Sequence, residues 1–213
     1  MRPLDPIEVR VLGVLAEKSL ATPDYYPLSL AALVTGCNQK TNREPVMELS
    51  ERDAAQAVAG LIRLGLAGTS GGAGSRVEKY RHALAEKLGL DESRQAALAV
   101  LLLRGAQTAG EVRQRSGRLY AFSSVEEAEG TLDSLEERDE PLAVRLPVQP
   151  GRSAARYAHL LSGDVEMNEE AGPSPSAAEP MQQARATDER IATLEAEVEQ
   201  LKAEFEAFRR RFE

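Results

Sequence analysis

Residues 50–82 read SERDAAQAVAGLIRLGLAGTSGGAGSRVEKYRH, and this stretch decides the fold. It opens with a capping box, in which the side chains of Ser50 and Asp53 each accept a hydrogen bond from the other's backbone amide. Apolar residues then recur at helical spacing until Gly65 ends the pattern. Two short extended segments follow, on either side of a glycine-rich tip, and predict a β-hairpin. A helix followed by a hairpin is the last part of a winged helix.

The same pattern occurs a second time. Ser124 opens another capping box 74 residues after Ser50, and the apolar positions of the helix that follows keep this offset. A second hairpin comes next, and its residues 157–159 match residues 80–82 at an offset of 77. One helix and hairpin design is therefore used twice in the chain.

This repeat predicts the fold class and the domains. We expect a mainly α-helical (α+β) protein with small β-wings, built from two tandem winged-helix domains at residues 1–89 and 90–165. Residues 166–186 are rich in Pro and Ser and poor in apolar residues, which predicts a disordered linker. Residues 187–213 carry a heptad pattern of apolar residues, which predicts a C-terminal coiled-coil helix.

The predicted tail helix needs a partner for its apolar seam. A parallel pair of such helices places Glu197 opposite Lys202 and Glu204 opposite Arg209 of the other chain, which favours a homodimer. The alternatives are a tail folded back on its own chain and a higher oligomer, since three phenylalanines are unusual in a narrow two-stranded seam.

Composition predicts a soluble, cytoplasmic protein. The single cysteine, Cys37, excludes an intramolecular disulfide and fits a reducing compartment. The N-terminus has no basic region followed by an apolar run, and no stretch reaches the ~18 apolar residues of a membrane span. We therefore expect no membrane partner.

Motifs for catalysis, cofactors or metals are missing from the sequence. The two histidines, His82 and His159, occupy equivalent strand positions, so matched packing explains them better than two active sites. One cysteine without Cys-x-x-Cys or His-x-His spacing makes a zinc site improbable, and the glycines at 71–74 lack the Lys-Ser/Thr ending of a P-loop. We expect no enzyme, no cofactor and no metal.

A polar connection of about a dozen residues joins the predicted second and third helices of the first domain. A helix-turn-helix needs only three or four residues there. The connection is rich in hydrogen-bonding side chains, so it is a candidate to bind phosphate, a base edge or a protein backbone. The alternative is that Asn38, Asn42 and Glu44 satisfy the loop's own backbone while residues 45–47 pack it down.

This connection also carries a resemblance. Residues 38–47, Asn-Gln-Lys-Thr-Asn-Arg-Glu-Pro-Val-Met, together with residues 75–82 and 104–111, resemble the signature of the YceH-like family of uncharacterised bacterial proteins. The resemblance covers about residues 3–162 and leaves out the tail. It implies two winged-helix domains in one cytoplasmic chain with a regulatory, DNA-binding role, and the family has no established activity to lend to this chain.

Charge is unevenly distributed along the chain. Residues 1–165 hold 20 basic and 22 acidic residues, and residues 166–213 hold 6 and 12, so most of the net charge of −8 lies in the tail. The first domain alone is +1 and the second −3, so neither is the basic body that nonspecific phosphate attraction usually needs. The densest basic cluster, Arg113, Arg115 and Arg118, is either a phosphate contact or a solvated face.

Two functions from different classes fit these observations. The first is a regulator that binds double-stranded DNA, with the helix after Ser50 in the major groove and the hairpin on phosphates or in the minor groove. The second is a protein-binding adaptor or scaffold without DNA binding. Glu51 and Asp53 at the leading end of the helix would face phosphates and be repelled by them, so the helix does not distinguish clearly between DNA binding and protein binding. The candidate nucleic-acid-binding residues are Lys40, Arg43, Arg52, Gln56, Arg63, Arg76, Lys79 and Arg81.

Overall fold

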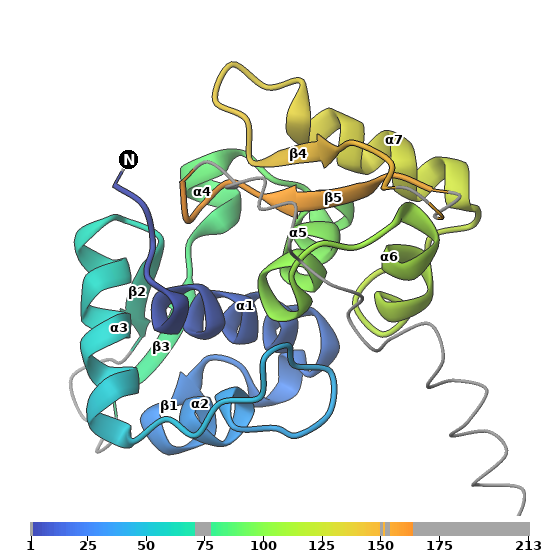
Figure 1. Ribbon diagram of the computed structural model, residues 1–213. Coiled ribbons are helices and arrows are strands. Elements are labelled where there is room, and N and C mark those ends of the chain that lie inside the picture. The colour runs from blue at the N-terminus through green and yellow to red at the C-terminus, as the bar shows by residue number, and fades with distance from the viewer. Residues whose placement is uncertain (1, 71–77, 150, 152–153, 164–213) are drawn as a thin grey trace, which may run out of the picture. The chain divides into compact units, whose positions relative to one another are not determined.

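The computed structural model describes residues 2–70, 78–149, 151 and 154–163, and helix α1 (Pro6–Ala21) lies at the centre of this part of the chain (Figure 1). A capping box between Asp5 and Glu8 starts the helix, with Pro6 at its first position. Residues 8–16 are all buried, so this part of α1 is enclosed on every side, as expected of a core helix.

The rest of the first half wraps around α1. Its elements are η1 (Pro23–Tyr25), β1 (Leu28–Ser29), α2 (Leu30–Cys37), α3 (Glu51–Arg63), β2 (Ala67–Ser70) and β3 (Lys79–His82). The three strands form an antiparallel sheet in the order β1-β3-β2. The Ser50–Asp53 capping box starts α3, which confirms the predicted helix and the two strands that follow it.

The second half begins after a short helix, α4 (Leu84–Leu88). Its elements are α5 (Glu92–Arg104), α6 (Ala109–Arg115), α7 (Val125–Glu136), β4 (Ala143–Leu146) and β5 (Arg156–His159). Strands β4 and β5 pair antiparallel, and Ser124 caps α7 as the sequence predicts. The described chain is therefore mixed α/β, about half helical with two small antiparallel sheets.

The internal repeat extends to single residue pairs. In the first half Leu28 of β1 pairs with Tyr80 of β3. In the second half an isolated antiparallel bridge joins Gln107 to Tyr157 of β5. Both bridges lie directly before the helix that follows, so the two halves share their hydrogen-bonding scheme as well as their sequence pattern.

The two halves share one core. A Cβ built on Gly13 of α1 would lie 2.9 Å from the side chain of Leu103 on α5, so the two helices cross in close contact. Buried apolar residues from both halves form one contiguous cluster. At the rim of this contact, Gln95 of α5 donates to the hydroxyl of Ser19. The division into two domains between residues 89 and 90 stays a prediction.

Some predicted features fall outside the part of the chain that the structure describes. They are the linker at residues 166–186, the coiled-coil helix at residues 187–213, and the hairpin tip with Arg76. Over the described ranges, no helix combines the length and apolarity needed to cross a membrane.

Candidate functional site

Helix α3 presents three of the predicted binding residues to solvent. Its buried face consists of Ala54, Ala57, Val58, Gly60 and Leu61, which pack into the core. Arg52, Gln56 and Arg63 are exposed, and their spacing of four and seven residues places them on one side of the helix. The structure thus brings these three side chains onto one outward face.

The leading end of α3 is acidic. Glu51 is exposed, and hydrogen bonds from Ser50 lower the pKa of Asp53, so that this carboxylate is ionised at neutral pH. The Asp53 carboxylate accepts from both the amide and the hydroxyl of Ser50. Asp53 is therefore occupied in starting the helix, and Glu51 is the acidic side chain left facing outward at this end.

The hairpin beside α3 carries two further candidates. Lys79 and Arg81 alternate along β3, so they share its exposed face while Tyr80 points into the core. Arg81 forms an exposed ion pair with Glu86 at 2.8 Å. Lys79 and Arg81 are thus accessible, although Arg81 has a competing partner.

The equivalent histidines are packing residues. The amide of Leu84 donates to Nδ1 of His82, so Nε2 carries the proton and donates to the hydroxyl of Ser19 at 2.8 Å. Burial lowers the pKa of His82, and that of His159, to about 4. Both imidazoles are therefore neutral at pH 7, which agrees with the interpretation of the two histidines at equivalent strand positions as matched packing.

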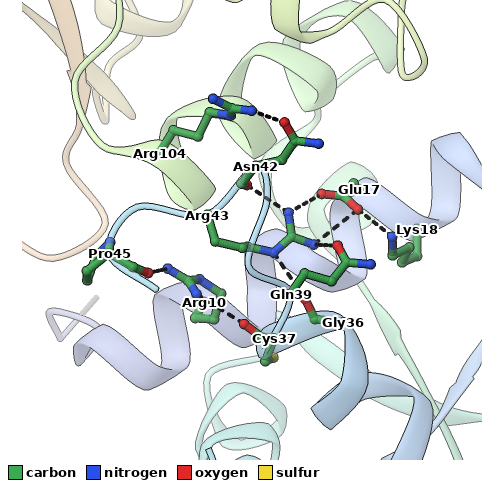
Figure 2. Close-up of polar contacts among 10 residues, drawn as sticks. All are labelled: Arg10, Glu17, Lys18, Gly36, Cys37, Gln39, Asn42, Arg43, Pro45 and Arg104. Carbon is green, nitrogen blue, oxygen red and sulfur yellow. Dashed lines mark hydrogen bonds and ion pairs between the residues drawn. The ribbon is translucent and has the colours of Figure 1, made fainter. Parts of the chain in front are cut away.

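Residues 38–49, named here the anchored loop, are fixed by a buried arginine (Figure 2). Arg43 has a side-chain exposure of 0%, and Nη1 and Nη2 donate to the two oxygens of Glu17 on α1 at 2.6 and 3.2 Å. Its three other N–H groups donate to the carbonyls of Gly36 and Asn42 and to the side chain of Gln39. All five guanidinium donors are thus satisfied within the protein.

Two further side chains hold the loop down. Arg10 of α1, 2% exposed, donates to the carbonyls of Cys37 and Pro45 (Figure 2). The side chain of Asn38 accepts from the amide of Leu49 at 2.8 Å and donates to its carbonyl at 2.9 Å. These bonds close the two ends of the loop on each other, which confirms the expectation that Asn38 satisfies the loop's own backbone.

The structure corrects the predicted role of Arg43. With no free donor and no exposed guanidinium, Arg43 is not available to a phosphate, whereas Lys40 on the same loop is exposed. The expectation that residues 45–47 pack the loop down is also wrong at Val46, which is 54% exposed. The missed signal was Glu17, an acidic residue at the end of an otherwise buried stretch of α1.

The loop also reaches the second half. Asn42 adopts a left-handed backbone conformation with φ of 62°, and its side chain accepts from Arg104 at the end of α5. The amide of Glu44 donates to the carbonyl of Leu103 at 2.8 Å. Asn42 and Glu44 therefore bond across to α5, where the sequence predicted bonds within the loop.

The predicted cluster of Arg113, Arg115 and Arg118 is not a single group. Arg113 donates to the carbonyls of residues 122 and 123, Arg115 pairs with Glu111, and Arg118 is exposed.

Elsewhere in the described residues, no group of three His, Cys, Asp or Glu side chains is arranged to hold a metal ion. Burial raises the pKa of the Cys37 thiol to about 12, which makes it a poor nucleophile.

These features define a protein in which a helix and hairpin pattern occurs twice, with a polar outward face on α3 and the anchored loop at residues 38–49. A family model described as "Protein of unknown function, DUF480" matches residues 4–152. A UPF0502 protein of Chromobacterium violaceum is 49% identical over 204 residues, which cover 94% of this chain and 88% of that protein. A relative from Geobacter sulfurreducens is 48% identical over 195 residues, which cover 92% of this chain and 88% of that protein. A relative from an Azoarcus species is 44% identical over 213 residues, which cover 99% of this chain and 94% of that protein.

The chain belongs to the DUF480/UPF0502 family of uncharacterised bacterial proteins. This confirms the expectation of an uncharacterised bacterial family, while the narrower YceH-like assignment stays a prediction. Similarity to the Azoarcus protein covers 99% of the chain, so it continues into the tail, which the resemblance had left out.

Proposed function

We propose that the protein is a DNA-binding regulator whose first half contacts the duplex. The observation that supports this most is the outward face of α3, where Arg52, Gln56 and Arg63 stand clear of the core on one side of the helix. Arginine and glutamine are the side chains that pair with guanine and adenine edges in the major groove. Lys79 and Arg81 on the adjoining hairpin are suited to backbone phosphates.

In this proposal each half is a winged helix. The order of three helices and a closing hairpin supports it in both halves, with the short strand β1 before the second helix of the first half and the single bridge at Gln107 in the same place of the second. In the first half α3 is the recognition helix and β2-β3 is the wing. The chain acts in the cytoplasm, and the heptad helix at residues 187–213 joins two copies so that the dimer meets two half-sites.

The second half has a different role, because its corresponding helix is acidic. Helix α7 contains five acidic residues and no basic residue between Val125 and Glu136. Phosphates would repel this surface, so the equivalent contact is restricted to α3. The acidity of α7 also favours the second candidate function, a protein-binding adaptor in which the second half contacts a basic partner.

Fluorescence anisotropy with labelled genomic fragments at several salt concentrations tests the proposal. We expect salt-dependent binding by the wild type, and a loss of roughly 5- to 150-fold for Arg52→Gln and for Arg63→Gln, since one base contact contributes about 1–3 kcal/mol. Arg145→Gln on β4 is the matched control, because Arg145 is also an exposed arginine but lies in the second half.

The outcome separates the two candidate functions. Loss of affinity in the α3 variants, with normal binding by the control, supports the DNA-binding regulator. If the wild type shows no salt-dependent binding to any fragment, the DNA proposal fails and the adaptor takes its place.

A further inference from the structure

Three arginines of the second half lie close together, each at one end of a helix or strand. Arg104 is the last residue of α5, Arg115 the last of α6, and Arg156 the first of β5. We name them the junction cluster. The side chains of Arg115 and Arg156 are each 22% exposed, and Arg104 is also partly buried. These guanidiniums are held at the surface by surrounding protein, unlike freely moving surface side chains.

Each member is fixed by neutral groups or by one shared carboxylate. Arg104 donates to the amide oxygen of Asn42, and Arg156 donates to the carbonyl of Ala106 at 2.6 Å. The carboxylate of Glu111 forms ion pairs with Arg115 at 3.4 Å and with Arg156 at 3.3 Å. This pre-organisation reduces the conformational entropy that a ligand must remove on binding.

The charges of the cluster do not balance. Glu111 pairs with Arg115 and Arg156 and also accepts from the amide of Thr108 to cap α6, and among the described residues it is the one carboxylate in an ion pair with this cluster of three positive charges. The Nε atom of Arg156 is buried and has no hydrogen-bond partner among the described residues. An excess of two positive charges and an unused donor are therefore concentrated at one place.

Neighbouring charge adds to this excess. Burial, and after it the positive charges of Arg115 and Arg43, lower the pKa of Arg104, so these guanidiniums lie close enough to repel one another. Glu17 neutralises Arg43 but also pairs with Lys18 at 2.6 Å, so one carboxylate serves two cations there as well. A site with this surplus is stabilised by an anion.

We propose that the junction cluster binds a phosphate group. Guanidinium forks match the oxygens of phosphate in pairs, and grouped arginines recognise phosphate for this reason. All three guanidiniums are partly exposed and would supply donors to the phosphate. The phosphate belongs either to a nucleic-acid backbone or to a small phosphorylated molecule, and the proposal stands independently of base contacts by α3.

Isothermal titration of the full chain with inorganic phosphate and with pyrophosphate, against chloride at equal ionic strength, tests binding of a free phosphate. Anisotropy with a short labelled duplex tests a backbone phosphate. Arg115→Gln is the test variant and Arg94→Gln the matched control, because Arg94 also lies on α5 but is paired with Asp91 at 2.6 Å. Arg104→Gln is a second test variant, so the proposal can still be tested if one of the two variants fails to fold.

We expect Arg115→Gln and Arg104→Gln to weaken phosphate binding roughly tenfold while Arg94→Gln binds as the wild type does. A loss seen with phosphate or pyrophosphate identifies a small phosphorylated ligand, and a loss seen only with the duplex identifies a nucleic-acid backbone. If neither probe separates the test variants from the control, the proposal is overturned. The α3 variants would still weaken duplex binding in that case if the proposed function is correct.

Discussion

Replacing Arg43 with alanine should lower the free energy of unfolding by about 3–5 kcal/mol, because it removes the two-bond partner of a largely buried carboxylate and leaves only Lys18 beside it. Glu17 is 14% exposed, and burial acts to raise its pKa, but hydrogen bonds from Arg43 and Lys18 reverse the direction and keep the pKa low. The substitution also removes the donors that satisfy the carbonyls of Gly36 and Asn42. A loss of this size is a large part of the ~5–15 kcal/mol that stabilises a typical domain.

Urea unfolding followed by circular dichroism measures this loss. Lys40→Ala on the same loop is the matched control and should change the unfolding free energy by less than about 0.5 kcal/mol, because Lys40 is exposed. Glu17→Gln and the double variant Glu17→Gln/Arg43→Ala complete a thermodynamic cycle, whose coupling should exceed about 1 kcal/mol for residues in direct contact. A loss below 1 kcal/mol for Arg43→Ala, similar to that of Lys40→Ala, would refute the anchoring role.

Three further predictions concern pH, salt and assembly. The pKa of His82 and of His159 is about 4 in the folded protein and about 6.5 in the unfolded chain, so each contributes about 3 kcal/mol to the free energy of unfolding above pH 6.5 and loses it as the pH falls to 4. The urea midpoint should therefore change less between pH 7 and pH 4.5 in a His82→Gln variant than in the wild type, and an equal change in both would contradict this. If the first half binds DNA, replacing Arg76, Lys79 and Arg81 with alanine should flatten the salt dependence by up to about one unit per contact, and an unchanged slope removes the hairpin from the interface. Light scattering should give a dimer for the full chain and a monomer for a chain ending at Asp164, whereas equal masses would show that the tail does not join two copies.

Local signals in the sequence were sufficient to predict the repeated elements. The capping box at Ser50 and the N-cap at Ser124 place the first residues of α3 and α7 because the bonds that start a helix lie within four residues. The predicted second capping box is wrong in one bond, because the Glu127 side chain accepts from Ser123 instead of from the amide of Ser124. The four hairpin strands could be predicted for the same reason, since alternation and turn residues are local. Strand β1 was not predicted, because it forms by pairing with β3, which lies far along the chain. Tyr80 and Tyr157 are buried at equivalent register positions, as the offset of 77 residues implies.

The roles of the loop residues could not be predicted in the same way. Lys40 and Arg43 are both cations in one polar string, and what separates them is Glu17, which lies 26 residues before Arg43 on another element. The contact of Asn42 with Arg104 spans 62 residues and exists only because α1 and α5 pack together. Burial of a charge depends on tertiary packing, so the sequence pattern gave Lys40 and Arg43 the same expected role.

The anchored loop and the junction cluster form one connected polar system. Arg43 donates to the carbonyl of Asn42, and the side chain of Asn42 accepts from Arg104, so a buried residue of the first half fixes an arginine of the second (Figure 2). Replacing a buried ion pair with apolar residues is often neutral or stabilising, so stability alone is a weak reason for the Arg43–Glu17 pair. Its directional bonds do what apolar contacts cannot, because they set the position of Asn42 and thereby the position of Arg104. On this argument the pair acts as a positioning device for the phosphate site that we propose.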